Sequence, residues 1–248
     1  MTEETYEFIT LTNENASELS EFLMSHFLLE EPLNRASGMT RQNFQPFVDK
    51  LFERTLNIPF SFALVEKESG KIAACAMSSL WKNEKNDHKG AGDSGNHGDE
   101  FTFGNEEKKE IGAIGKILTE LHAKFFQLRP DIVQDEIEST RKNNWEWIRS
   151  QNKYDSRQEI LSVAKEHQRR GLASKLMAKM EDAKKINEFN CSGIASEISS
   201  LANQCLMKKR GYTIITETLL ASECDASGNP LIVTDDGTDR VLLVEKDF

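Results

Sequence analysis

The stretch that decides the fold runs from Gln158 to Lys185 and reads QEILSVAKEHQRRGLASKLMAKMEDAKK. Its apolar run from Ile160 to Ala164 predicts a short buried strand. After Gly171, leucine and methionine recur every three or four residues, which predicts an amphipathic helix. A basic turn containing Gly171 joins the two, so the stretch predicts a strand, a turn and a helix in succession.

The turn from Gln168 to Ala173 has the composition of a phosphate-binding site. The first N–H groups of a helix lack partners within the helix and lie at the positive end of its dipole. Gly171 and Ala173 leave room for a pyrophosphate to approach the backbone, and Arg169 and Arg170 add positive charge. The alternative, from these residues alone, is an ordinary strand-to-helix connection with solvated arginines.

A family resemblance favours the first interpretation. The turn Gln168–Ala173 matches Q/R-x-x-G-x-G/A, the acetyl-coenzyme A (acetyl-CoA) signature of the GNAT N-acetyltransferase superfamily. The residues that follow also resemble this family, with a predicted strand at 190–195, a helix over about 199–210, and Gly211-Tyr212 where the family commonly has Gly-Phe. The resemblance implies an α/β (α+β) GNAT fold, in which a mixed, mostly antiparallel sheet is splayed between strands 4 and 5 and flanked by helices.

The resemblance also implies acetyl-CoA as cosubstrate and assigns residues to it. A backbone N–H near Val163, on the strand before the turn, would stabilise the oxyanion of the reaction, because the family's central strands separate there. The expected acetyl-CoA-binding residues are Val163, Gln168, Arg169, Arg170, Gly171, Leu172, Ala173, Ser174 and Asn203.

The composition is that of an acidic chain of 248 residues with a formal net charge of −10. Nucleic-acid phosphates need a basic surface, so we expect no nucleic-acid partner, whereas an acidic chain suits a cationic amine. The N-terminus lacks the basic and apolar regions of a signal peptide, and no apolar run approaches about 18 residues, so we expect no membrane segment. The four cysteines form no C-x-x-C pair, which favours a reduced, cytoplasmic protein, and we expect a monomer.

The rest of the chain predicts one domain spanning residues 1–248. Strands are predicted at 6–11, 60–65, 72–77, 213–220 and 241–244. Helices are predicted from 13 or 15 to about 31, and over about 40–56, 106–128 and 131–150. The polar residues of about 82–100 predict an inserted loop, whose His88 and His97 have a spacing that fits no zinc pattern, so no metal site is predicted.

Two further segments resemble the invertebrate (insect- and nematode-type) arylalkylamine N-acetyltransferases, which acetylate dopamine, serotonin, octopamine and tyramine. Phe27–Asn34, FLLEEPLN, is similar to the Glu-Pro-Leu-Asn segment at the end of that family's first helix. Ser199–Met207, SSLANQCLM, is similar to its Ser-Ser-x-x-Ser-x-x-x-Met run. In that family the glutamate before the proline is the general base, which implies this role for Glu31. Without the resemblance, Glu31 would be interpreted as a solvent-facing carboxylate at a helix end.

The reaction also needs a proton for the coenzyme A thiolate, whose pKa is about 8.5. The resemblance places Ser199 and Asn203 at the positions of two serines that take this role in the family. Asn203 departs from the pattern because an amide cannot relay a proton as a hydroxyl does. Ser199, Ser200 or water therefore remain as donors, and Ser199 has the alternative role of a helix N-cap.

The sequence thus predicts an acetyl-CoA-dependent N-acetyltransferase in which a small arylalkylamine attacks the thioester directly in a ternary complex. The alternative acceptor is a polyamine or another small amine. An alternative of a different class is a weakly active acetyl-CoA-binding protein, favoured by Asn203 and by Met207, which stands where many superfamily members have tyrosine. A protein acetyltransferase is disfavoured because the insertions between the third and fourth predicted strands would cover an open peptide groove.

Overall fold

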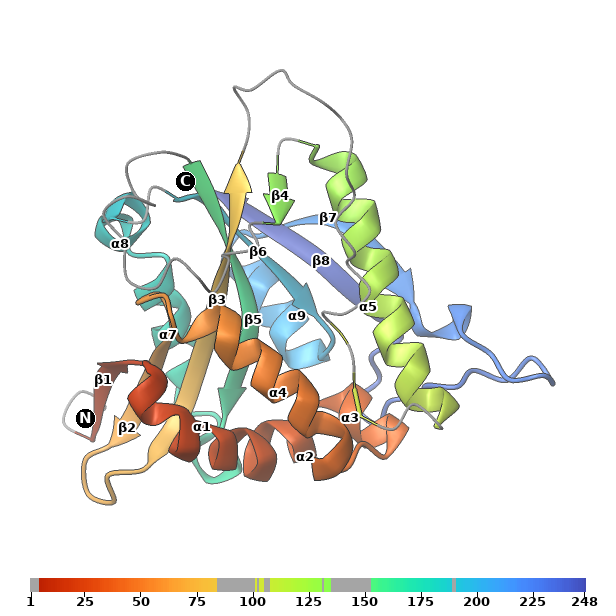
Figure 1. Ribbon diagram of the computed structural model, residues 1–248, viewed down its shortest axis with the longest axis horizontal. Helices are drawn as coiled ribbons and strands as arrows, with labels where there is room; N and C mark the ends of the chain where they lie inside the picture. The colour runs from red at the N-terminus through yellow and green to blue at the C-terminus, as the bar shows by residue number, and fades with distance from the viewer. Residues whose placement is uncertain are drawn as a thin grey trace.

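The computed structural model describes residues 5–83, 101, 103–104, 108–130, 132–134, 153–188 and 191–248. Its strands form one sheet in the order β1-β2-β3-β5-β6-β8-β7, with β4 paired to β3 (Figure 1). They are β1 Tyr6–Thr10, β2 Phe62–Glu66, β3 Ile72–Asn83, β4 Ile132–Gln134, β5 Lys153–Val163, β6 Cys191–Ile198, β7 Thr213–Leu219 and β8 Arg240–Asp247. Strands from both ends of the chain therefore belong to the same sheet.

Among the described strands, the parallel neighbours are β5 and β6, which pair from Tyr154–Cys191 to Gln158–Ser196. Beyond this last pair the two strands continue without pairing and diverge (Figure 1). The other neighbours are antiparallel, so the mixed, mostly antiparallel and splayed sheet confirms the expected fold class. Because β4 is an additional short strand, the splay lies between the fifth and sixth strands in chain order.

Strand β4 lies where the sequence pattern predicted the start of a helix over 131–150. Ile132–Gln134 pairs antiparallel with Trp81–Asn83 of β3, so the helix prediction is wrong for these residues. The β-branched side chains of Ile132 and Val133 favour the extended backbone that this pairing needs. Residues 135–152 lie outside the described part of the chain. The predicted loop at 82–100 overlaps the end of β3 at Asn83, and residues 84–100 also lie outside the described part.

Strand β5 begins at Lys153, well before the predicted start at Ile160. The added portion includes Asp155, Arg157 and Gln158, which are buried in spite of their polarity. A polar run in a sequence is typical of an exposed loop, and the burial of Asp155 and Arg157 depends on partners that lie far away in the chain. The short apolar run therefore predicted only the C-terminal part of the strand.

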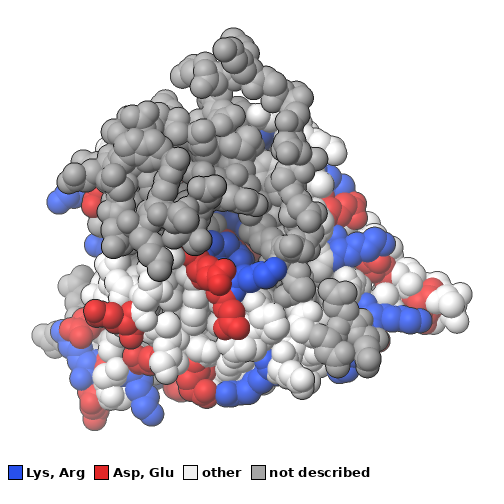
Figure 2. All heavy atoms as spheres, in the orientation of Figure 1, with Lys and Arg blue, Asp and Glu red and all other residues white. Residues whose placement is uncertain are grey.

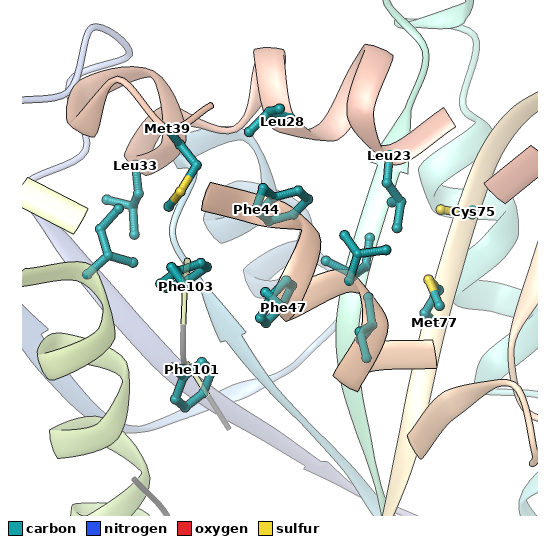
Figure 3. Close-up of a cluster of buried hydrophobic side chains, with 14 of the residues drawn as sticks. Leu23, Leu28, Leu33, Met39, Phe44, Phe47, Cys75, Met77, Phe101 and Phe103 are labelled. Atoms are coloured by element: carbon teal, nitrogen blue, oxygen red, sulfur yellow. The ribbon is translucent and has the colours of Figure 1, made fainter. Parts of the chain in front are cut away.

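Helices cover both faces of the sheet (Figure 1). The first face carries α1 Ala16–Phe22, α4 Arg41–Thr55 and α5 Lys109–Leu128, and the second carries α7 Leu172–Met180, α8 Ala183–Glu188 and α9 Leu201–Lys209. Figure 3 shows the first layer, in which Phe44, Phe47 and Phe103 pack together and Cys75 and Met77 of β3 lie to their right. Burial of this apolar surface fixes α4 and α5 against the sheet.

The first helical run ends where proline predicts. Helix α1 continues through a π-helical turn at Leu23–Phe27 into α2, Leu28–Glu30. Glu31 is extended, with ψ at 126°, because the residue before a proline avoids helical geometry. A new helix, α3, then spans Pro32–Ser37. The predicted end near Glu31 is confirmed, and the break leaves Glu31 at the N-cap of α3.

The described surface shows no large field of one charge on the face drawn in Figure 2, where acidic and basic side chains are interspersed. Within the described residues, no helix combines the length and the apolar character that a bilayer crossing requires. Cys75 and Cys191 are buried, while Cys205 and Cys224 are exposed.

Candidate active site

A cavity of about 480 Å³ opens at the splay between β5 and β6. Both strands line it, and the turn before α7, the start of α9 and the segment joining α2 to α3 complete its walls. Its lining residues are Phe27, Glu30, Glu31, Pro32, Arg35, Gln158, Glu159, Leu161, Ser162, Val163, Gln168, Arg169, Gly171, Leu172, Ala173, Ser174, Ser196, Glu197, Ile198, Ser199, Ser200, Ala202, Asn203, Leu206, Met207 and Asp236. The cavity therefore brings together segments from four distant parts of the sequence.

The β5 wall presents backbone groups to the cavity. A β-bulge at Glu159, between the Met77–Ile160 and Ser78–Gln158 pairs, bends the strand as it leaves β6. Past the bulge, Ala164 donates its N–H to Ala73 of β3 at 2.9 Å. Because neighbouring residues of a strand direct their N–H groups to opposite edges, the N–H of Val163 points toward the splay. Among the described residues, Val163 therefore lies at a strand edge that faces the splay, and its role as oxyanion donor stays a prediction.

The basic turn has the geometry of an anion-binding helix start. Arg169 and Gly171 have positive φ angles of 62° and 81°, which curl the chain into α7, and no side chain caps that helix among the described residues. Eight of the nine predicted acetyl-CoA-binding residues line the cavity: Val163, Gln168, Arg169, Gly171, Leu172, Ala173, Ser174 and Asn203. Arg170 does not line it, because its guanidinium instead donates to the Tyr6 hydroxyl at 3.0 Å.

Glu31 lines the same cavity and is held by two hydrogen bonds. One carboxylate oxygen accepts the backbone N–H of Asn34 at 2.7 Å, and the other accepts the hydroxyl of Ser199 at 2.7 Å. Burial raises the pKa of Glu31 above its ordinary value, and the hydrogen bonds from Ser199 and Asn34 partly oppose this rise. A carboxylate with a raised pKa is a stronger base near neutral pH, provided that it is ionised.

The structure distinguishes the residue that caps α9 from the residue that contacts Glu31. Ser200 is the N-cap of α9, because its hydroxyl accepts the N–H of Asn203 at 3.3 Å. The alternative of Ser199 as N-cap is therefore wrong, and its hydroxyl is directed to Glu31 instead. Ser199, Ser200 and Asn203 line the cavity, together with Met207. The fold thus places Glu31 and Ser199 in direct contact across 168 positions of sequence.

Sequence reasoning missed a buried ionic chain beside the cavity. Arg157 of β5 donates to Glu197 of β6 at 3.2 Å and lies 3.5 Å from Glu159, while Glu159 also accepts from Arg54 of α4 at 2.7 Å. His122 of α5 is fully buried and contacts Glu197. Glu159 and Glu197 both line the cavity. No local pattern marks these residues, because each partner lies on a different element.

The splayed mixed sheet, with a basic turn opening into a helix at the mouth of the splay, is the fold of the GNAT N-acetyltransferases, as the resemblance of the turn predicted. Arylalkylamine N-acetyltransferase 2 from Aedes aegypti superposes with a TM-score of 0.69 at 18% identity, over 98% of each chain. Mosquito arylalkylamine N-acetyltransferase-like 5b gives 0.68 at 14% identity, over 98% of this chain and 100% of that one.

Another similar structure is that of an enzyme with a different activity. The Drosophila melanogaster polyamine N-acetyltransferase, which catalyses formation of N-acetylagmatine, gives a TM-score of 0.67 at 15% identity, over 98% of this chain and 100% of that one. No protein-family profile and no curated protein sequence matches the chain. The similarity is therefore one of fold.

Proposed function

We propose that this protein is an acetyl-CoA-dependent N-acetyltransferase that acetylates the primary amine of a small arylalkylamine, of the serotonin, dopamine, tyramine and octopamine class. The observation that carries the proposal is the partly buried Glu31–Ser199 pair, which faces a basic helix start across one cavity. A base with a raised pKa and an anion-binding turn are the two elements that this two-substrate reaction needs.

The turn suits the diphosphate of coenzyme A. The first N–H groups of α7 carry the positive end of a helix dipole, and Arg169 lines the cavity beside them. The position that a Cβ would take at Gly171 has no atom within 4 Å, so a phosphate oxygen has room to approach the backbone. From this turn, the arm of coenzyme A would follow the unpaired edge of β5 past Val163 toward Glu31.

The base removes the first proton. Glu31 takes a proton from the alkylammonium, directly or through water, and the free nitrogen attacks the thioester carbonyl to form the new C–N bond. The N–H of Val163 donates to the oxyanion of the tetrahedral intermediate. Collapse of this intermediate breaks the C–S bond.

The proton balance involves Ser199. The nitrogen loses two protons on going from ammonium to amide; one ends on the coenzyme A sulfur and the other enters solvent. Ser199 donates to Glu31 at 2.7 Å, so a protonated Glu31 can return its proton to Ser199 as the serine hydroxyl releases one to the thiolate. Asn203 lines the cavity and can donate a hydrogen bond to sulfur, but not a proton.

A polyamine or another small cationic amine is the second candidate for the acceptor. The acidic side chains of the lining support it: besides Glu31 they are Glu30, Glu159, Glu197 and Asp236. Glu159 pairs with Arg54, and Glu197 pairs with Arg157. Among the described residues, the one ion pair of Glu30 is with the exposed ammonium of Lys165, at 3.4 Å. An amine with a second positive charge would find carboxylates here.

The test is release of coenzyme A, followed with a thiol reagent, for tryptamine, serotonin, dopamine, tyramine, octopamine, spermidine and a lysine peptide. Cys205 and Cys224 are exposed, so these thiols are titrated before the reaction is started. Higher kcat/KM for the arylalkylamines supports the first candidate, and higher kcat/KM for spermidine selects the second. Thermal stabilisation by acetyl-CoA without turnover of any amine would contradict the enzyme assignment.

A further inference from the structure

At the closed end of the cavity, the side-chain oxygen of Gln158 has no hydrogen-bond partner among the described residues. Gln158 lies at the apex of the splay, where it forms the last β5–β6 pair with Ser196, and both residues line the cavity. Gln158 is only 3% exposed. Nearly all buried amide oxygens in proteins are bonded, so the amide of Gln158 is an unsatisfied polar group at this end of the cavity.

The neighbours of Gln158 do not meet this need. The Ser196 hydroxyl donates instead to the backbone oxygen of Gln158, at 3.1 Å. Ser78, which pairs with Gln158 in the β3–β5 register, has a buried hydroxyl that is also unpartnered in the described structure. The apex is therefore polar, although the core that surrounds it on this face is apolar.

The proposed reaction places a particular part of the substrate at this apex. If the diphosphate of coenzyme A lies at the turn and the thioester carbonyl lies near Glu31 and Val163, the acyl group projects away from the turn. Along β5 the direction from Val163 toward Gln158 is the direction into the closed end of the splay. Each methylene added to the acyl group would extend it farther toward the Gln158 amide.

We propose that Gln158 sets the acyl selectivity of this site, favouring acetyl-CoA over acyl-CoA thioesters with longer alkyl chains. This inference rests on the proposed function. The Gln158 amide is already shielded from solvent, so a longer acyl chain can enter the closed end only by packing its apolar methylenes against a buried polar group to which it cannot hydrogen-bond. An acetyl group ends before this contact.

The test compares binding and turnover of acetyl-CoA and butyryl-CoA in the wild type and in Gln158→Met. Methionine has a similar length without an amide, so it keeps the volume of the apex and removes its polarity. We expect the ratio of kcat/KM for butyryl-CoA to that for acetyl-CoA to rise about tenfold, the size of effect that one methylene has in a pocket. The ratio of calorimetric dissociation constants should move in the same direction, a readout that does not require turnover.

Ser156→Ala is the matched control. Ser156 lies on the same strand and the same face, is fully buried with an unpartnered hydroxyl, and does not line the cavity. It should leave the acyl preference unchanged. Two results would overturn the role of Gln158 and leave the proposed function intact. One is an equal shift of the kcat/KM ratio in Ser156→Ala. The other is a ratio that moves less than about twofold in Gln158→Met while acetyl-CoA still binds. Failure of the wild type to bind either thioester would overturn this role together with the proposed function.

Discussion

Arg157 is the residue whose loss should damage the fold most among the charged groups beside the cavity. Its guanidinium is buried between the rings of Trp81 and Phe101, at 5.2 and 5.3 Å from their centroids, and contacts the carboxylates of Glu159 and Glu197. Arg157→Ala removes the cation that both carboxylates share and leaves their negative charges buried on two diverging strands.

The magnitude follows from what remains buried. Removing one partner of a buried ion pair costs about 3–5 kcal/mol, because the other charge loses its compensation. Arg54 and His122 still contact the two carboxylates, which favours the lower part of this range. With a urea m-value of about 1–3 kcal/mol/M and a loss of about 3 kcal/mol, the unfolding midpoint of Arg157→Ala should fall by roughly 1–3 M.

Equilibrium urea unfolding, followed by tryptophan fluorescence, measures this loss. Arg240→Ala is the matched control, because Arg240 also bridges two carboxylates, Glu217 and Asp239, but does so on the surface. Its unfolding midpoint should hardly move, since exposed ion pairs are screened by water. A loss of less than about 1 kcal/mol in Arg157→Ala would refute the reasoning that the buried chain holds the splayed strands together.

Three further changes have defined outcomes. Ser199→Ala removes a hydrogen bond that lowers the pKa of Glu31, so the acid limb of kcat/KM should move to higher pH; an unmoved limb would argue against Glu31 as the titrating base. Gly171→Ala forces a Cβ into the left-handed region at φ 81°, which should cost about 1–2 kcal/mol in unfolding and raise the KM of acetyl-CoA but not of the amine. Arg169→Gly should raise the KM of acetyl-CoA without loss of stability, because glycine suits the φ of 62° better than arginine does; a lower unfolding midpoint would contradict this.

The local part of the fold could be predicted from the sequence. The run Ile160 to Ala164 and the helix after Gly171 have apolar periodicities that neighbours in the chain determine, and both elements are present. The break at Glu31 followed from the proline after it. Where backbone restriction or periodicity decides the structure, a single sequence is sufficient.

The polar part of β5 and the ionic chain could not be predicted in this way. Asp155 and Arg157 are buried because partners on other elements satisfy them, and those partners are brought near only by the finished fold. Likewise, the contact between Ser199 and Glu31 joins positions whose separation in sequence carries no signal. The family resemblance named both residues, and the structure adds that they touch.

The identity of Glu31 as the base is the central claim, and Glu31→Gln tests it most directly. Glutamine keeps a side-chain oxygen for the Asn34 N–H, so the start of α3 should be preserved, but the amide cannot accept a proton. The measurement is kcat/KM against pH for the amine that reacts best, with the dissociation constant of acetyl-CoA measured alongside.

The account predicts that Glu31→Gln lowers kcat/KM at pH 7 by about 10²–10⁴ and that the loss shrinks toward pH 10, where the amine is already deprotonated. The affinity for acetyl-CoA should remain that of the wild type, since Glu31 belongs to the segment between α2 and α3 and not to the turn that is proposed to bind the diphosphate. A variant that keeps the wild-type rate at pH 7 would contradict the claim, as would a loss that is equally large at every pH.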